Sequence, residues 1–530
     1  MAAAGAASLG ALSLAGCAPI KESSLSSTGS AGASAPGEWD IETDIVVVGA
    51  GGAGLVAACR AKELGSEVIL LEKMPTIGGD TAYSSQTAQG FWTGHVEEGD
   101  SIECYLEDLR NSHWATEKGM LGIDLPATTP LTEAWLNNCD DMYEWTQSKG
   151  MDWQGHLTPH KAWYPQPQWD RYDLRSWVPG NGSIVSVMQN VIKDLGVEVM
   201  TETSAISLFT DESNRVCGVM ALEDESPITI RANKGVILTC GGFNANRAMM
   251  ANYLPLQGGG YCGGSNGNTG DGQIMAAALG AQLKDMDLST HWMTYDSAAD
   301  TTFYLAACGD YGGNSDTYPD SIDYPFIFVN YEGERYAAET LGYKYTGYHT
   351  NAQPYHMGYI LFDSGDACKQ WFNACLKAFG ADEVGSGAGY GDLSKMRIAE
   401  GESLEELANM MQVDATALKA TIARYNELVE KGVDEDFGRS MRGVAKLDTA
   451  PYFAIRMQPR HYTTYGGVAI DEKGHVLDTS DNPIPGLYAA GTVAGSVLEQ
   501  EGIYYQGGVG ISLVQGFYTA KIAHDEGGEA

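Results

Sequence analysis

The stretch from Asp44 to Gly54 constrains this chain more than any other part of its sequence. Ile45–Val48 is a continuous β-branched run, which predicts a strand buried on both faces. Gly49, Gly51 and Gly54 follow it with the spacing Gly-x-Gly-x-x-Gly. The first glycine permits a tight turn, the second lets a pyrophosphate approach the backbone, and the third lets the next helix pack against the strand. The stretch therefore predicts a nucleotide-binding strand, turn and helix.

The residues that follow this turn have the spacing of a dinucleotide-binding unit. The sequence predicts a helix over residues 55–64, whose N-terminus presents free N–H groups and a partial positive charge to phosphates. A second apolar strand over residues 67–71 ends at Glu72, where a carboxylate can accept a hydrogen bond from a ribose hydroxyl. The glycine motif alone is a weak signal. The complete order of elements makes an ordinary glycine turn the weaker interpretation.

A second glycine turn follows the acidic residue directly. Lys73 leads into residues 77–81, which read Ile-Gly-Gly-Asp-Thr. A turn of this kind so soon after the ribose-binding position resembles the FAD-dependent oxidoreductases of the fumarate reductase and 3-ketosteroid dehydrogenase superfamily. The resemblance implies that the dinucleotide is FAD, bound non-covalently, and that this loop touches its phosphate and flavin.

Further motifs continue the resemblance in the family's order over about residues 41–522. They occupy residues 235–243, where a strand ends in Gly-Gly-Phe, and residues 268–272, 421–439, 465–468, 484–491 and 507–511. The last of these starts a closing helix, and the resemblance implies that the N-terminus of this helix points at the flavin. The FAD contacts implied by the resemblance are Gly49, Gly51, Gly52, Ala53, Gly54, Glu72, Lys73, Gly78, Gly79, Asp80, Thr81, Gly241, Gly242, Asp271, Gly491, Thr492, Gly508, Val509 and Ile511. Thr492 departs from the family, in which many members have glutamate.

Length and aromatic content predict two domains. A chain of 530 residues exceeds what one hydrophobic core usually serves. Twelve of its 28 tyrosines lie between Tyr295 and Tyr359, a block that we assign to a substrate-facing domain. We therefore expect an α/β fold, with a Rossmann-like FAD-binding domain and an inserted α+β substrate domain, the clamp or cap. The expected segments are 1–19 (signal and lipobox), 20–40 (flexible linker), 41–286 (FAD-binding domain, first part), 287–463 (substrate domain) and 464–523 (FAD-binding domain, second part).

Composition argues against several kinds of partner. A net charge of −37 opposes binding to nucleic acid and to anionic membrane surfaces, because both would repel the chain. The ten cysteines include no Cys-x-x-Cys pair, which argues against iron–sulfur clusters and covalent c-type haem, and no metal site is expected. The sequence predicts no second strand, Gly-x-Gly-x-x-Gly turn and helix in succession that could bind a nicotinamide. We expect a small-molecule substrate and a separate electron donor, such as a cytochrome or a membrane flavoprotein.

The N-terminal residues have the character of a targeting segment. Residues 2–15 are small and apolar, too few to span a bilayer, and lead into Leu-Ala-Gly-Cys17, which resembles the cleavage site of a lipoprotein signal peptide. A tether rich in Ser, Ala and Gly follows over residues 22–37. We expect export, with a lipid on Cys17 anchoring the protein at the outer face of the cytoplasmic membrane. No Lys or Arg precedes the apolar run, so either the true start codon lies further upstream or the signal is broken. A cytoplasmic location is the alternative.

The expected substrate site departs from the dicarboxylate reductases of this superfamily. In those enzymes arginines and histidines clamp the substrate carboxylates, because paired, charge-assisted hydrogen bonds suit arginine. This chain has Tyr343 at the position of the catalytic arginine. Tyr505 occupies the position of the clamping arginine before the closing Gly507-Gly508 pair. Thr463 occupies the position of the histidine before the Gly466-Gly467 pair. An alignment shifted by one residue would bring in Tyr462 or Tyr504.

Uncharged residues at these positions predict an uncharged substrate. A carboxylate without a cationic partner costs on the order of several kcal/mol. Tyrosines there resemble the 3-ketosteroid dehydrogenases, in which tyrosine hydroxyls and a glycine N–H polarise a ketone and exchange a proton with carbon. We assign carbonyl polarisation and α-proton transfer to Tyr343 and Tyr505, or Tyr504. The N–H groups of Gly507 and Gly508 would complete an oxyanion hole worth roughly 3 kcal/mol per donor.

Three other residues are candidates for substrate binding, namely His291, Trp292 and Thr463. His291 and Trp292 lie near the position of a substrate-binding histidine in the family. For His291 we favour a purely structural role over substrate binding.

The sequence as a whole predicts an FAD-dependent oxidoreductase that reduces, or in reverse desaturates, the C=C bond of a neutral α,β-unsaturated ketone, steroid-like or polyphenol-like. One alternative is an ene-reductase for an unsaturated carboxylate of the urocanate, cinnamate or fumarate type, with an arginine supplied by Arg171, Arg175 or Arg460. The other is a non-catalytic flavoprotein that only relays electrons.

Overall fold

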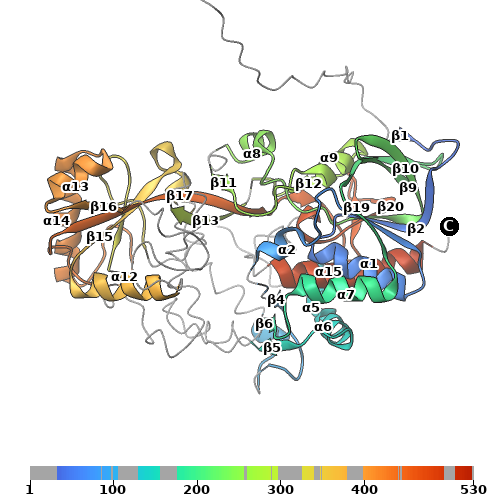
Figure 1. Cartoon of the computed structure of the whole chain (residues 1–530), viewed down its shortest axis with the longest axis horizontal. Helices are drawn as coiled ribbons and strands as arrows, with labels where there is room; N and C mark the ends of the chain where they lie inside the picture. Colours follow the sequence, from blue (N-terminus) through green and yellow to red (C-terminus); the bar gives the residue numbers. More distant parts are fainter. Residues whose placement is uncertain are drawn as a thin grey trace, which may run out of the picture.

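The computed structural model describes residues 33–84, 86, 88–96, 99–105, 129–155, 176–255, 260–287, 289–295, 325–339, 347, 349–378, 398–439, 441, 444–494 and 508–527. These residues form two lobes, which the long strand β17 (Tyr452–Thr464) connects (Figure 1). We call them the nucleotide lobe, which contains both chain ends of the described part, and the clamp lobe, which contains the described residues between 325 and 457 and the other strands that pair with β17. Among the described helices, none is long and apolar enough to cross a bilayer.

A nine-stranded mixed sheet forms the centre of the nucleotide lobe. Its path runs β1-β8-β9-β10-β2-β3-β7, and β20 pairs with β10 while β19 pairs with β20. The strands β2, β3, β7, β10 and β20 pair in parallel, and β8, β9 and β10 form an antiparallel meander. The strands are β1 (Ala33–Ser34), β2 (Ile41–Val48), β3 (Val68–Leu71), β7 (Glu198–Met200), β8 (Thr203–Thr210), β9 (Val216–Glu223), β10 (Ser226–Leu238), β19 (His475–Leu477) and β20 (Pro483–Ala489).

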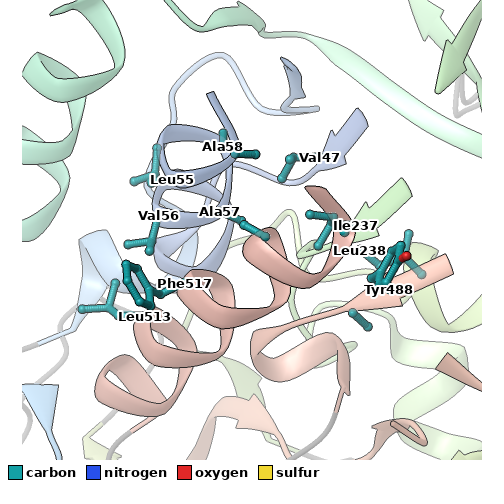
Figure 2. Packing of buried hydrophobic residues seen from close by; sticks show 14 of the residues in the cluster. Val47, Leu55, Val56, Ala57, Ala58, Ile237, Leu238, Tyr488, Leu513 and Phe517 are labelled. Atoms are coloured by element: carbon teal, nitrogen blue, oxygen red, sulfur yellow. The ribbon is translucent and has the colours of Figure 1, made fainter. Parts of the chain in front are cut away.

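Three helices cover this sheet and form its core with the central strands. They are α1 (Gly52–Glu63), α7 (Ile184–Leu195) and α15 (Gly508–Glu526). Figure 2 shows Val56 of α1 beside Leu513 and Phe517 of α15, with Val47 and Ile237 on the strands to the right of these helices. Each such side chain contributes about 1.5–3 kcal/mol when it is fully buried. The β-branched run therefore lies where the sequence predicts it, in the middle of the sheet and covered on both faces.

Two expectations about the nucleotide lobe were wrong in detail. The sequence predicts one strand over residues 228–232 and another that starts at residue 235 and ends in Gly-Gly-Phe, but in the structure both runs belong to one strand, β10. A register shift between Ala232 and Gly235 lets β10 continue along β2, since Gly235 has a φ of +150° that other residues rarely adopt. The sequence of residues 155–180, with tryptophans among prolines and charges, predicts irregular structure, whereas Ser176–Pro179 forms β6 in a small sheet with β4 (Ala88–Gln89) and β5 (Trp153–Gly155).

The clamp lobe is built on a six-stranded sheet with helices beside it. β17 lies at its centre and pairs with four other strands of the sheet. The elements are β11 (Tyr261–Cys262), β13 (Ser289–Tyr295), β14 (Ile327–Val329), β15 (Gly358–Asp363), β16 (Ile398–Gly401), α12 (Asp366–Ala378), α13 (Leu404–Met411) and α14 (Ala415–Lys431). The expected domain limits at 286/287 and 463/464 fall just before β13 and at the end of β17.

A buried ionic network holds the clamp lobe together. Arg335 donates to Glu339 at 2.7 Å and to Asp434 at 2.8 Å, and Arg439 donates to the same Glu339 at 2.7 Å. The side chains of Glu339, Asp434 and Arg439 are completely inaccessible to solvent. The N–H of Phe328 donates to the second oxygen of Glu339. The network therefore connects the residues around β14 to the turn after α14, and its charges compensate one another out of water.

A histidine between two carboxylates fixes the end of α15. His475 of β19 lies 2.7 Å from Asp471 through Nδ1 and 2.7 Å from Glu526 through Nε2. Lys473 contacts the same Glu526 at 3.0 Å. Hydrogen bonding to Asp471 and then to Glu526 raises the pKa of His475, although burial opposes the change.

The remaining elements are short and connect the larger ones. They are α2 (Gly79–Tyr83), α5 (Pro130–Asn137), α6 (Cys139–Ser148), α8 (Arg247–Tyr253), α9 (Asp271–Ala278), the 3₁₀ helices η4 (Pro354–His356) and η6 (Gly491–Ala494), and the strand pair β12 (Leu283–Lys284) and β18 (Gly467–Val468).

Candidate functional site

The first glycine turn contains two glycines that the fold itself requires. Gly49 has a φ of +105°, and a Cβ there would lie 2.6 Å from the Cα of Cys240. At Gly54 a Cβ would overlap the carbonyl oxygen of Gly49, because α1 packs directly on the turn. A side chain at either position would therefore break the contact between β2, α1 and the start of the Gly-Gly-Phe turn.

Gly51 is different, because nothing in the protein requires a glycine there. Its φ is −77°, an ordinary value, and a Cβ would meet no atom within 4 Å. The space beside Gly51 is therefore open, at the N-terminus of α1. A helix N-terminus with open backbone is the place where a pyrophosphate binds in dinucleotide-binding folds. The residues present thus fit FAD, and the need for glycine at this position comes from a ligand.

Glu72 is placed to receive a ribose. Its Oε2 accepts a hydrogen bond from the N–H of Ala50 at 3.0 Å, and its Oε1 accepts one from the N–H of Met74 at 2.8 Å. The residue is 8% exposed. Each oxygen retains further acceptor capacity, since a carboxylate has about four lone-pair sites. The carboxylate is therefore fixed beside the turn and can still accept from hydroxyl groups.

The second glycine turn packs against the first. Gly78 has a φ of +127° and forms a backbone bridge with Gly51. A Cβ at Gly79 would lie 3.1 Å from the Cα of Gly51. Thr81 Oγ1 accepts from the N–H of Gly52 at 3.1 Å. The structure thus brings these five residues together, although they come from segments about thirty positions apart.

Two polar contacts connect these turns to the loop before α9. Lys73 donates to Asp271 at 2.7 Å and to Thr269 at 2.5 Å. Asp80 accepts from the N–H of Ser265 and from the side-chain amide of Asn268, both at 2.6 Å. Sequence reasoning missed Ser265 and Asn268 as site residues. The available signal was the polar run that precedes Gly270, because such residues commonly occupy turns and helix starts.

The turn after β10, Gly241-Gly242, lies between the loop before α9 and the end of β17. A Cβ at Gly241 would overlap the side-chain oxygen of Asn268, and one at Gly242 would overlap Thr464 Oγ1. Thr464 also accepts from the N–H of Phe243 at 2.9 Å. Thr464 is a third residue that sequence reasoning missed. It joins the end of β17 to the turn that follows β10.

The closing helix α15 lies against α1. A Cβ at Gly516 would overlap the carbonyl oxygen of Ala53, and the N–H of Gly491 donates to Gln515 at 2.8 Å. The first turns of α15 contain Gly508, Val509 and Ile511, and Thr492 lies in η6. The start of α1 therefore lies beside the middle of α15, while Gly510, near the start of α15, lies against Gln89 of β4. The N-terminus of α1 favours anionic groups of a dinucleotide.

Half of the expected substrate residues lie outside the part of the chain that the structure describes. Tyr343, Tyr504, Tyr505 and Gly507 lie outside the described residues. His291 and Trp292 belong to β13, which pairs with β17 in antiparallel orientation.

The register between β13 and β17 gives the residues that face one another on the two strands. His291 lies opposite His461, Trp292 opposite Arg460, and Thr290 opposite Thr463. Thr463 is 7% exposed, and its Oγ1 donates to the carbonyl oxygen of Thr464 at 3.2 Å. Within the described part, the substrate candidates thus lie on the paired strands β13 and β17. The end of β17 contacts the Gly241-Gly242 turn.

The fold and this arrangement of turns define an FAD-dependent oxidoreductase with a second lobe beside the cofactor site. The chain belongs to the FAD binding domain family, whose model matches residues 44–511. The resemblance inferred from the motifs, the α/β class and FAD as cofactor are thereby confirmed.

Characterised relatives come from both branches of the superfamily. The NADH:fumarate oxidoreductase of Klebsiella pneumoniae (strain 342) is 30% identical over 464 residues, which cover 86% of this chain and 44% of that protein. The chain thus spans less than half the length of this relative. The urocanate reductase of Eggerthella lenta is 29% identical over 468 residues, covering 87% and 71%. The 3-oxosteroid 1-dehydrogenase of Mycolicibacterium smegmatis is 26% identical over 576 residues, covering 90% and 96%.

Solved structures with the same fold also come from both branches. The open conformation of a flavocytochrome c3 fumarate reductase has a TM-score of 0.68 at 24% identity, covering 92% of this chain and 79% of that one. The 3-ketosteroid Δ1-dehydrogenase of Sterolibacterium denitrificans has a TM-score of 0.70 at 21% identity, covering 91% and 99%. These likenesses concern the fold.

Proposed function

We propose that this protein reduces, or in reverse desaturates, the C=C bond of a neutral α,β-unsaturated ketone that is steroid-like or polyphenol-like. The observation that carries the proposal is the absence of charge at the three positions where the dicarboxylate branch has cationic groups. Those positions are Tyr343, Thr463 and Tyr505.

Thr463 supports a neutral substrate through its surroundings. It is buried near the end of β17, and its hydroxyl donates to a backbone carbonyl. A threonine in this position supplies no positive charge, and a carboxylate brought to it without a cation costs on the order of several kcal/mol. A ketone oxygen makes no such demand, because neutral donors satisfy it.

The chemistry divides between the cofactor and the protein. When bound, FAD supplies or takes up the hydride at the β-carbon of the substrate. In the reducing direction Tyr505, with the N–H groups of Gly507 and Gly508, donates to the carbonyl oxygen and stabilises its developing negative charge. Tyr343 then gives a proton to the α-carbon, so that one hydride and one proton complete the saturated bond.

We also propose a separate electron donor, such as a cytochrome or a membrane flavoprotein. The support is the single strand, Gly-x-Gly-x-x-Gly turn and helix in succession at residues 44–64, which the FAD site uses.

The test is anaerobic reoxidation of the reduced holoenzyme, followed by the flavin absorbance. Neutral enones should reoxidise it within the turnover time, while fumarate, urocanate and cinnamate should leave it reduced. Reoxidation by one of the acids and not by any enone would overturn the proposal. Reduction without reoxidation by any compound would favour an electron relay.

One observation favours the carboxylate alternative. Arg460 is half-buried on β17, three residues before Thr463, and lies opposite Trp292. However, its guanidinium group lies over the ring of Tyr462 at 5.8 Å, and the alternation of burial along β17 places Arg460 and Tyr462 on the face opposite to Thr463. The variant Arg460→Met discriminates, because it should abolish turnover of an acid and leave turnover of an enone unchanged.

We also propose export and attachment of a lipid at Cys17, on the strength of the Leu-Ala-Gly-Cys sequence. Expression of the chain with its natural upstream sequence and labelling with a palmitate analogue tests this. Incorporation that is lost in Cys17→Ala supports an anchor at the outer face of the cytoplasmic membrane. An unlabelled protein recovered with the cytoplasmic fraction would contradict it.

A further inference from the structure

Asn244 joins the cofactor site to the strand that carries substrate candidates. It lies two residues after the Gly241-Gly242 turn and is 5% exposed. Its side-chain Nδ2 donates to the carbonyl oxygen of His461 at 3.2 Å and to that of Tyr462 at 3.1 Å. One side chain beside the cofactor turn thus binds two successive residues of β17, whose first half pairs with β15 and β16 in the clamp lobe.

The two carbonyl groups belong to a β-bulge. Thr290 lies opposite Thr463, but His291, the next residue of β13, lies opposite His461. At this point β17 thus has one residue more than β13. In a regular antiparallel strand successive carbonyl groups point to opposite edges, so one side chain would not reach both. A bulge bends the strand and breaks this alternation, which lets Asn244 reach both carbonyl groups.

A short side-chain amide supplies the donors that this bulge uses. Carbonyl oxygens accept and do not donate, so the NH₂ group of Asn244 must face β17. A third, weaker contact of this group reaches Sγ of Cys262 on β11 at 3.4 Å. Among the residues that the structure describes, none donates to Oδ1 of Asn244. The side chain is therefore held by its N–H donors, and serine offers only one such donor and ionised aspartate none.

A second contact holds β17 on the other side of Thr463. The N–H of Phe243 donates to Oγ1 of Thr464 at 2.9 Å, and a Cβ at Gly242 would overlap the same oxygen. The cofactor turn thus binds β17 directly before Thr463, through Asn244, and directly after it. These contacts fix the position of Thr463 relative to the turn.

The turn itself is part of the cofactor site. The side chain of Asn268 fills the space beside Gly241, and the N–H of Gly270 donates to the carbonyl oxygen of Gly242 at 3.1 Å. The family resemblance implies FAD contacts at both glycines of the turn. A dinucleotide that orders this turn would therefore also order Asn244, and through it the bulge in β17.

We propose that Asn244 is a positioning residue that couples the FAD site to β17. When FAD orders the Gly241-Gly242 turn, the side-chain amide of Asn244 fixes the bulge and, with it, the distance of Thr463 from the cofactor. This coupling is the same for a ketone and for a carboxylate substrate. It rests on the proposed function only in taking Thr463 as part of the substrate site.

Hydrogen exchange measures the coupling without a substrate. Mass spectrometry follows exchange in peptides that cover residues 44–55 and residues 458–464, without FAD and with FAD at about ten times its dissociation constant. In the wild-type protein FAD should slow exchange about tenfold in both segments, because amides that exchange when the site opens become exposed about tenfold less often. An end of β17 that FAD does not protect in the wild-type protein would overturn the proposal.

The decisive variant is Asn244→Asp, which keeps the shape and removes the donors. It is measured at about pH 8, where the new carboxyl group is ionised. With FAD at the same multiple of its dissociation constant, residues 44–55 should stay about tenfold protected, while the protection of residues 458–464 should fall to about twofold or less. Equal protection of the two segments would contradict the proposal. Asn244→Ala removes the donors without adding a charge and takes its place if Asn244→Asp does not fold.

Asn426→Asp is the matched control. Asn426 of α14 also binds backbone, since its Nδ2 donates to the carbonyl oxygen of Leu447 at 3.0 Å and its Oδ1 accepts from the N–H of Leu447 at 2.8 Å. Leu447 belongs to the hydrophobic core of the clamp lobe. The substitution removes the same kind of donor, yet FAD should still protect both segments about tenfold. Equal loss of protection at residues 458–464 in this control would assign the effect to general destabilisation and sink the proposal.

Turnover provides a second measurement. With the enone that reoxidises the wild-type holoenzyme fastest, FAD-saturated Asn244→Asp should have a kcat at least about tenfold lower, while Asn426→Asp should stay within about twofold of the wild type. A kcat near the wild-type value in Asn244→Asp would show that the amide does not position the site. If no enone reoxidises the enzyme, the proposed function fails, and the exchange result still decides the role of Asn244.

Discussion

The backbone N–H of Ala50 donates a 3.0 Å hydrogen bond to Oε2 of Glu72 and so ties the end of one strand to the turn after its neighbour. The carboxylate that should receive the ribose is thereby held in place before any ligand arrives. A second hydrogen bond, from the N–H of Met74, fixes its other oxygen. Preorganised groups lose little conformational freedom on binding, which increases affinity.

Gly51→Ala should separate the needs of the ligand from those of the fold. The new methyl group meets no protein atom, so the melting temperature of the apoprotein should not change. It enters the space of the pyrophosphate, and FAD affinity should fall at least about tenfold, or about 1.4 kcal/mol. Gly54→Ala is the comparison, because its methyl group overlaps Gly49 and should lower the stability of the apoprotein. Unchanged FAD affinity in Gly51→Ala would contradict our assignment of the site.

Tyr343→Phe and Tyr505→Phe should each leave FAD bound and slow turnover of an enone. Loss of a proton donor or of a carbonyl donor should lower the rate at least about tenfold, which corresponds to about 1.4 kcal/mol. Tyr504→Phe is the control for the alignment, because the assigned register leaves it outside the chemistry. Steady-state rates with matched flavin content provide the measurement. Near-wild-type rates in the first two variants would remove the proposed roles.

Glu339→Gln should strongly destabilise the clamp lobe. The substitution leaves Arg335 and Arg439 facing a neutral group in a site closed to water, and breaking a buried pair of this kind costs about 3–5 kcal/mol. Denaturant unfolding followed by circular dichroism measures the change. Glu435→Gln removes an exposed carboxylate that pairs with Lys431 and should have little effect. Equal stability of the two variants would show that the buried network is dispensable.

His475 should make stability depend on pH above neutrality. Its folded-state pKa is raised by Asp471 and Glu526, so the stabilisation is fully present below the unfolded-state value of about 6.5 and is lost as the pH rises through the folded-state value. In His475→Gln this decline should disappear. Melting temperatures between pH 6 and pH 9 provide the test, and a decline that persists in the variant would assign it to another group.

The sequence predicted the nucleotide lobe well because its signals are local. The run at Ile45–Val48 and the three glycines after it determine a strand and a turn without reference to distant residues. By contrast, the contacts of Asp80 with Ser265 and Asn268 join segments nearly two hundred positions apart. Nothing near Asp80 in the sequence indicates which donors it will meet.

The clamp lobe was predicted less completely for a related reason. The tyrosine block predicted a second domain, but neither periodicity nor spacing indicated that Arg335, Glu339 and Arg439 form one network. Likewise, the break between residues 232 and 235 suggested two strands, whereas a single bulge with Gly235 in an unusual conformation keeps β10 continuous. Such features depend on tertiary pairing, which overrides local preference.

The strand β17 has a consequence for how the two lobes unfold. Its first half pairs with β15 and β16 in the clamp lobe, and its last residue, Thr464, receives a hydrogen bond from the Phe243 N–H at the cofactor site (Figure 1). Thirteen residues of one extended strand reach about 43 Å and leave no loop between the lobes at this connection. Melting of either lobe removes partners from a strand that the other lobe also uses. Heating should therefore disorder both lobes in a single transition, and bound FAD should protect the remote clamp helices as well as its own site.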